Sequence, residues 1–260
     1  MTKQLLFYES CIPVTPERHQ DYTVDVGSDY SFARDTNSVL ITCLEFTRIA
    51  REYPVVFAAA DARKESVPMP VAVIGLNENK NLCVNTEGHW NARYVPASVR
   101  QYPFIFSRMD DSQSLVLCVD ESFNGFNRDG RGKKLFDENG KQSGYLQDIT
   151  GFLGGFQSEY QRTQNLCELL HSLELFEEME ARIALPSGRK IAMQGFLTVD
   201  RNKLEALPQE KLGELARIGY LELIYLHLQS LDNFDLLVER LGNKHQGGPD
   251  KFHTEQTTPP

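Results

Sequence analysis

The pattern of apolar and polar positions changes its period near the middle of the chain. In the N-terminal half, short apolar runs alternate with turns rich in Pro, Gly and Asn, and such runs predict buried β-strands. These runs are residues 55–60, 70–76, 81–84, 104–106 and 114–120. From Leu146 onwards, apolar residues recur every three or four positions, which predicts helices. We therefore predict an α+β fold, with a mixed or antiparallel sheet built mainly from the N-terminal half and packed by C-terminal helices.

Three helices are predicted in the second half of the chain. A long amphipathic helix follows residues 146–173, and a shorter helix lies around residues 209–218. A third helix, from about Leu221 to Leu241, is apolar on nearly every side, so we expect it to be buried.

A hairpin and a tail complete the predicted organisation. Residues 180–200 predict a hairpin that turns at residues 186–188, where Pro, Ser and Gly follow one another. Residues 242–260 are too polar to pack a core, which predicts a disordered tail. We therefore expect a single domain over residues 1–241.

Two segments of the N-terminal half share one motif. "REYPVVF" (residues 51–57) and "RQYPFIF" (residues 100–106) both read Arg-x-Tyr-Pro, two apolar residues, then Phe. Because proline disfavours helical geometry in the residue before it, each copy is predicted to end a short helix, bury a tyrosine and begin a strand. A possible capping box of Thr42 and Glu45 would start the first of these helices. The alternative is a binding element used twice.

Composition and charge narrow the class of protein. The 260-residue chain is 41% hydrophobic and 24% charged, which is typical of soluble globular proteins. It shows no signal peptide and no apolar stretch of membrane-spanning length, so we expect a cytoplasmic protein without a transmembrane segment. Five widely separated cysteines predict reduced, mostly buried thiols. A net charge of −9 disfavours nucleic acid and favours a basic or neutral polypeptide partner.

The leading site hypothesis is a binding surface around the single tryptophan. The segment "EGHWNARY" places Trp90 beside Arg93 and Tyr94, and aromatic and arginine residues are the types that anchor protein interfaces. If the two Arg-x-Tyr-Pro junctions converge in space, they would extend this surface with four further residues, namely Arg51, Tyr53, Arg100 and Tyr102. The alternative is that Trp90 packs on the edge of the core.

A metal site is the alternative hypothesis. His19 and Asp21 form an H-x-D triplet, the first two ligands of a two-histidine, one-carboxylate iron site, and His89 could supply the third. Arg100 could then bind the carboxylate of a cosubstrate. The simpler interpretation is a surface histidine in a proline-rich turn, and no other cofactor is expected. Common hydrolase, zinc-protease, phosphate-loop and dinucleotide motifs do not occur.

Two further ionisable positions have structural as well as functional interpretations. Asp120 and Glu121 end a predicted strand, where carboxylates can act as acids or bases, although such residues more often face water. His227 lies in an apolar helix, and we interpret it as a hydrogen-bonded core histidine rather than a metal ligand.

Several stretches together resemble the SapC family of bacterial proteins. They run in order from about Leu5 to Leu241 and include "LFYESCIPVTPERH", "SFARDTNSVLITCLEFTRIAREYPVVF", "PVAVIGLNENKNLCVNTEGHWNARYVPASVRQYPFIF", "LFDENGKQS" and "GYLELIYLHLQSLDNF". The resemblance implies an accessory role in envelope or nutrient-uptake systems, associated with surface-layer proteins or TonB-dependent receptors. It implies neither a reaction nor catalytic residues.

Two functions follow as hypotheses. The first is a non-catalytic cytoplasmic binding or adaptor protein of a bacterial envelope system that recognises a peptide or protein partner. The second is an enzyme of unrecognised type, such as an Fe(II)-dependent oxygenase that acts on a peptide or protein. The sequence is compatible with a monomer and with a homodimer.

Overall fold

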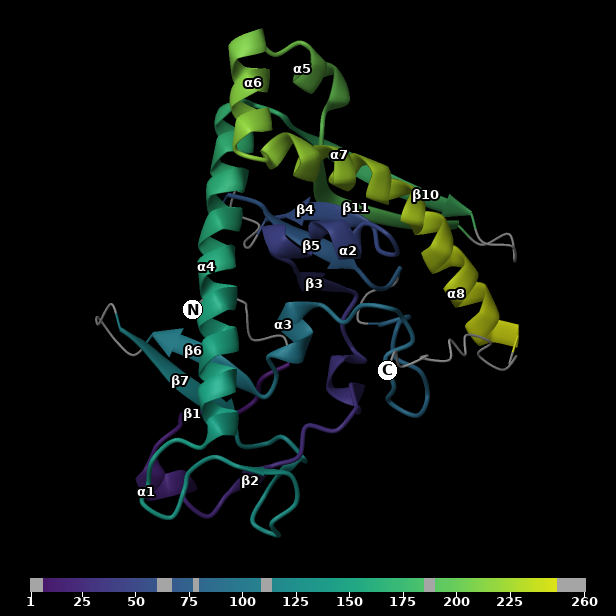
Figure 1. The fold of residues 1–260 in the computed structure, drawn as a ribbon. Helices are drawn as coiled ribbons and strands as arrows, with labels where there is room; N and C mark the ends of the chain where they lie inside the picture. The colour runs from purple at the N-terminus through teal and green to yellow at the C-terminus, as the bar shows by residue number, and fades with distance from the viewer. Residues whose placement is uncertain (1–6, 60–66, 77–79, 109–113, 185–189, 247–260) are drawn as a thin grey trace, which may run out of the picture.

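The fold combines three antiparallel sheets with one long helix and a group of C-terminal helices (Figure 1). The structure, a computed structural model, describes residues 7–59, 67–76, 80–108, 114–184 and 190–246. The predicted α+β class is confirmed. In the described residues, the strands within each sheet pair in the antiparallel direction.

The largest sheet has five strands in the order β10-β11-β4-β5-β3. The strands are β3 (Ser38–Leu40), β4 (Val55–Ala58), β5 (Met69–Val73), β10 (Phe176–Ala184) and β11 (Lys190–Val199). The N-terminal half thus supplies three strands, and the predicted C-terminal hairpin joins the sheet by pairing Leu197 with Phe57. The turn of that hairpin lies outside the described residues.

Strand β4 is buried on both faces. Side chains alternate across a strand, so Val55 and Phe57 point to one core while Val56 points to the other. The first core lies between the sheet and helices α4 (Gly144–Ser172) and α7 (Tyr220–Ser230), and the second lies between the sheet and helix α8 (Phe234–Gln246). This double burial explains why the sequence of β4 is an uninterrupted apolar run.

Helix α4 (Gly144–Ser172) is the long helix of Figure 1, and it contacts strands of all three sheets. Ser143 caps it, because the Ser143 hydroxyl accepts a hydrogen bond from the Leu146 amide at 3.2 Å. Leu146 and Leu153 belong to a third core, which also contains Val24, Phe104 and Val119 of the two smaller sheets. Leu166 and Leu170 pack against the core of the five-stranded sheet. The predicted helix over residues 146–173 is therefore confirmed.

The C-terminal helices confirm the prediction in part, since the helix Gln209–Arg217 matches the one predicted around residues 209–218. They are α5 (Arg201–Glu205), α6 (Gln209–Arg217), α7 (Tyr220–Ser230), the 3-10 turn η3 (Leu231–Asn233) and α8 (Phe234–Gln246). A single helix from about Leu221 to Leu241 is wrong, because η3 interrupts it. Helix α8 also continues past the predicted start of the tail at residue 242, and residues 247–260 lie outside the described residues.

The interruption has a physical cause in polar contacts with strand β4 and the turn before it. The Ser230 hydroxyl accepts a hydrogen bond from the backbone amide of Val55 at 2.9 Å. The side-chain NH₂ group of Asn233 donates to the carbonyls of Ala50 and Tyr53 at 2.8 and 3.1 Å. At this point the chain crosses the sheet, since α7 contacts the Phe57 face and α8 contacts the opposite face.

Two smaller sheets form the lower part of the molecule in Figure 1. One has the order β1-β7-β6, built from β1 (Cys11–Pro13), β6 (Phe104–Arg108) and β7 (Leu115–Asp120). The other has the order β8-β2-β9, built from β2 (Thr23–Val24), β8 (Phe126–Asn127) and β9 (Lys133–Lys134). The short helical turns α1 (Pro16–His19) and η1 (Ser31–Ala33) connect the N-terminal strands.

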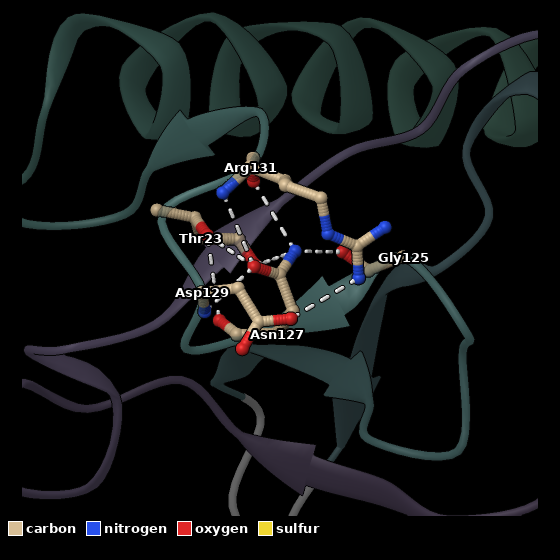
Figure 2. A network of polar contacts seen from close by, with 5 residues as sticks. All are labelled: Thr23, Gly125, Asn127, Asp129 and Arg131. Carbon is tan, nitrogen blue, oxygen red and sulfur yellow. Dashed lines mark hydrogen bonds and ion pairs between the residues drawn. The ribbon is translucent and has the colours of Figure 1, made fainter.

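Asn127 holds the loop between β8 and β9, as Figure 2 shows. Its side-chain oxygen accepts hydrogen bonds from the Thr23 hydroxyl at 2.9 Å and from the amides of Asp129 and Arg131 at 3.0 and 3.3 Å. Its side-chain nitrogen donates to the Gly125 carbonyl at 2.9 Å. A buried amide with this many partners fixes the loop against β2.

Residues 81–84, which we predicted as a strand, do not form a strand of any of the three sheets. In the described residues this segment contributes an isolated bridge between Val84 and Trp90, and its backbone hydrogen bonds go to separate segments. The Asn81 amide donates to the Arg34 carbonyl, the Leu82 amide donates to the Ile74 carbonyl, and the Cys83 carbonyl accepts from the Asn91 amide. The Asn81 side chain instead donates to the Ala33 carbonyl and accepts from the Cys83 amide, which draws the backbone away from a regular ladder.

Candidate functional site

Both Arg-x-Tyr-Pro segments are junctions between a helical turn and a strand. The first connects η2 (Cys43–Glu45) and α2 (Phe46–Ile49) to β4, and the second connects α3 (Ala97–Arg100) to β6. Tyr53 and Tyr102 are both buried, as the junction interpretation predicts. The capping box of Thr42 and Glu45 is also confirmed.

The two junction tyrosines lie in different aromatic clusters. The Tyr53 hydroxyl donates to the Tyr94 carbonyl at 2.6 Å and accepts from the Trp90 indole at 3.0 Å. Tyr102 instead stacks on Phe32, with ring centroids 4.2 Å apart. Tyr30 lies between the clusters, 5.7 Å from Trp90 and 6.1 Å from Phe32. The junctions therefore share an aromatic core through intervening rings and do not form one pocket.

The segment that carries Trp90 is held by two buried carboxylates from the first junction. Glu52 accepts hydrogen bonds from the amides of Arg93 and Tyr94 at 3.0 and 2.8 Å. Glu45 accepts from the Tyr94 hydroxyl at 3.1 Å and from the Ala97 amide at 2.7 Å. Because buried carboxylates need such donors, these bonds fix residues 93–97 onto the helical turn 43–52.

Tyr94 is the centre of a surface cluster of arginines. The guanidinium carbons of Arg48 and Arg100 each lie 5.6 Å from the Tyr94 ring centroid. Arg100 also donates to the Tyr94 hydroxyl at 3.2 Å and to the Val95 carbonyl at 3.0 Å, and it lies 5.2 Å from the Phe152 ring. Burial, and next the Glu45 carboxylate, raise the pKa of Tyr94, so its hydroxyl stays protonated at neutral pH.

The outer face of the helical turn 43–52 continues this surface. Leu44, Thr47, Arg48 and Arg51 are all exposed at a spacing of three to four residues. Cys43, Glu45, Phe46, Ile49 and Glu52 are buried, and Ala50 is half-buried. Leu44 is 71% exposed, and the next most exposed large apolar side chain in the described residues is 45% exposed. Arg93 is exposed beside Tyr94. We call Leu44, Arg48, Arg51, Arg93, Tyr94 and Arg100 the arginine surface.

The predicted binding residues therefore separate into two groups. Arg51, Arg93, Tyr94 and Arg100 belong to the arginine surface. Tyr53 and Tyr102 are buried, and Trp90 is half-buried, packs against the core and gives its indole N–H to Tyr53. The structural interpretation of Trp90, packing on the edge of the core, thus describes its contacts.

The alternative metal set is not assembled. The described residues contain no group of three His, Cys, Asp or Glu side chains that could hold a metal ion. His19 is fully buried, with Nδ1 accepting from the Thr15 amide at 3.1 Å and Nε2 facing Glu121 at 3.0 Å, so both ring nitrogens have partners. The interpretation of His19 as a surface histidine is wrong as well. Asp21 and His89 are exposed.

Buried polar groups at the strand ends act within the fold. Asp120 is fully buried, contrary to the expectation that it faces water, and accepts from the amides of Glu9 and Ser10 at 2.8 and 3.1 Å. Glu121 pairs with Arg18, and this pairing, with a further contribution from His19, lowers the pKa of Glu121 to about 2. These contacts tie the N-terminal segment to β7.

His227 is a core histidine, as predicted. It is fully buried, Nδ1 lies 2.8 Å from the Val55 carbonyl, and Nε2 accepts from the Val199 amide at 3.1 Å. Burial lowers the pKa of His227 to about 4, so the ring is neutral at neutral pH.

Sequence reasoning missed four residues of the site. Leu44 and Arg48 lie four residues apart on one helix face, and this spacing was available in the sequence. The roles of Glu45 and Glu52 depend on contacts with residues more than 40 positions away, which no local pattern shows.

Comparisons with known proteins identify the family. Residues 14–237 match the SapC family model, which covers most of the chain, so the chain belongs to the SapC family. No curated protein and no solved structure matches it. Across the described residues, no helix has the length and apolar character needed to cross a membrane.

Proposed function

We propose that this member of the SapC family is a non-catalytic binding or adaptor protein that recognises a peptide or protein partner through the arginine surface. The observation that carries the proposal is the arrangement at Tyr94. Two guanidinium groups lie against one half-buried ring, and an apolar side chain that is 71% exposed lies one helical turn from Arg48. Arginine and tyrosine are residue types enriched at interface hot spots, and the exposed leucine adds apolar area that a partner can bury.

The way the surface is built supports a binding role. Glu45 and Glu52 fix the backbone of residues 93–97, so the arginine side chains project from a segment that is already ordered. A surface that is ordered before binding loses less conformational entropy when a partner docks.

The setting of this function is part of the proposal. The family resemblance favours a cytoplasmic role in a bacterial envelope system linked to surface-layer proteins or TonB-dependent receptors. No observation in the structure favours the oxygenase alternative, because His19, Asp21 and His89 do not form a ligand set.

A random peptide display library tests the proposal. The full-length protein is used as bait, and enriched peptides are then assayed against the Leu44→Ser and Ile218→Ser variants. Both side chains are exposed, at 71% and 45%, so neither substitution should disturb the core. We expect enriched peptides to lose affinity for the Leu44→Ser variant and to retain affinity for the Ile218→Ser variant. Ile218 lies directly after α6 and outside the arginine surface.

Two results would contradict the proposal. One is a library that yields no enriched peptides over an empty support. The other is a set of peptides whose affinity is the same for the parent protein and for Leu44→Ser.

A further inference from the structure

The arginine surface has a charge opposite in sign to that of the whole chain. The protein carries a net charge of −9, yet Arg48 and Arg100 both lie against the Tyr94 ring. Arg93 directly precedes Tyr94 in the chain, and Arg51 is exposed three residues after Arg48. The two carboxylates beneath them, Glu45 and Glu52, are buried and accept hydrogen bonds from backbone amides. Glu52 also faces Arg240 at 3.7 Å.

The guanidinium groups keep unused donors. In the part of the chain that the structure describes, Arg48, Arg51 and Arg93 have no carboxylate oxygen within 4.0 Å of their nitrogens. Arg100 uses two N–H groups, toward Val95 and Tyr94. Each guanidinium has five N–H groups, so most of the donors at this surface are available to an acceptor from outside.

We propose that the partner segment is acidic, an extended peptide that carries carboxylates and one aliphatic side chain. This inference rests on the proposed function and adds the chemical class of the partner. Carboxylates are the acceptors that match the fork of arginine donors, and Leu44 supplies an apolar contact beside Arg48.

The spacing of the arginines fits a short peptide. Because Arg48 and Arg100 each lie 5.6 Å from the same ring centroid, their guanidinium carbons are at most 11.2 Å apart, twice that distance. In an extended peptide, side chains two residues apart point to the same side and lie roughly 7 Å apart. Alternate glutamates can therefore reach both arginines, and a leucine two residues further on lies on the same side.

A peptide fits better than other anionic partners. The rest of the chain is strongly acidic, so a long polyanion such as nucleic acid would be repelled outside the arginine surface. A short peptide remains within the range of the local charge, because salt screens interactions beyond about 8–10 Å. Net charge alone favours a basic or neutral partner, but the local charge favours an acidic one.

The closing experiment compares matched peptides on the full-length protein by fluorescence anisotropy. One peptide contains the pattern Glu-Ser-Glu-Ser-Leu, and its control replaces both glutamates with glutamine. We expect the acidic peptide to bind about tenfold more tightly than its control, with a difference that shrinks as salt is raised. The double substitution of Arg48→Gln and Arg93→Gln should weaken acidic-peptide binding by about tenfold. Arg217→Gln, an exposed arginine of α6, should not.

Arg48→Glu provides a second test. It should weaken binding of the acidic peptide further and improve binding of a version with lysine in place of glutamate, because the charge of the contact is reversed. Circular dichroism of every variant confirms that the fold is intact.

The outcomes distinguish this inference from the proposed function. The acidic class is wrong if the acidic peptide does not bind, if its glutamine control binds equally well, or if a single-stranded oligonucleotide of the same charge binds as tightly. If library peptides without acidic residues bind and depend on Leu44, the proposed function stands while the acidic class is wrong. If the library yields no peptides, the proposed function itself fails.

Discussion

Substitution of His227 by glutamine should remove a large part of the acid sensitivity of this protein. The imidazole is fully buried and joins three elements, since it belongs to α7, faces the Val55 carbonyl of β4 and accepts from the Val199 amide of β11. An acceptor nitrogen must lose its hydrogen bond when it is protonated. The ring can therefore take up a proton only at a cost to the fold.

The magnitude follows from the pKa of His227. Burial lowers it from 6.5 to about 4, so between these values the unfolded chain binds more protons than the folded chain. The contribution of the neutral His227 ring to the free energy of unfolding is complete above pH 6.5 and is lost as the pH falls toward 4. The pKa difference corresponds to about 3 kcal/mol in total, of which about 2.5 kcal/mol is lost between pH 7.5 and 4.5.

Other groups with a known shift titrate outside this window. The pKa of Glu121 is lowered from 4.5 to about 2, so the stabilisation due to Glu121 is complete above pH 4.5 and is lost only below it. The small loss from Glu121 at pH 4.5 is the same in the parent and in His227→Gln, so the difference between the two proteins from pH 7.5 to 4.5 isolates the histidine contribution.

Urea unfolding followed by the fluorescence of Trp90, the only tryptophan, measures the effect. His227→Gln should be less stable than the parent at pH 7.5, because glutamine keeps a donor and an acceptor but loses the ring that packs against Phe57, with ring centroids 5.0 Å apart. Its free energy of unfolding should then fall by about 2.5 kcal/mol less than that of the parent between pH 7.5 and 4.5. His171→Gln is the matched control, because His171 is exposed at the end of α4. Equal losses in the parent and in His227→Gln would refute the argument.

Three further predictions test other parts of the structure. Glu52→Gln should lower the free energy of unfolding by about 2 kcal/mol, because one of the amides of Arg93 and Tyr94 would then face an NH₂ group; a change below about 0.5 kcal/mol in urea unfolding would contradict this. Asn127→Ala should cost about 2 kcal/mol and increase amide hydrogen exchange in the loop between β8 and β9, with unchanged exchange there as the contrary result. Burial raises the pKa of the Cys11 thiol to about 11, so Cys11 should react with a disulfide reagent at pH 8 more slowly than free cysteine, and a rate equal to that of free cysteine would be inconsistent with the structure.

The local pattern of the chain determined its elements. Proline before an apolar run was sufficient to place both junctions, because the residue before proline avoids helical geometry whatever surrounds it. The period of three to four residues placed α4, and the odd number of scattered cysteines predicted thiols that the structure shows as free, four of them buried. The junctions and α4 depend on residues close together in sequence, and the cysteine prediction depends on number and spacing, so none of these features requires the tertiary structure.

Only the tertiary structure decided which elements share a core and which side chains share a surface. The pattern of residues 221–241 is compatible with one helix, and the break at η3 arises from contacts of Ser230 and Asn233 with a segment more than 170 positions earlier. Likewise, Trp90 packs against the core and donates its indole N–H to the Tyr53 hydroxyl, 37 positions earlier in the chain. Arg48 became part of the site because the buried carboxylates of Glu45 and Glu52 hold Tyr94 beside it. A buried carboxylate accepts hydrogen bonds from whichever donors the fold places beside it, and the sequence pattern does not show which donors those are.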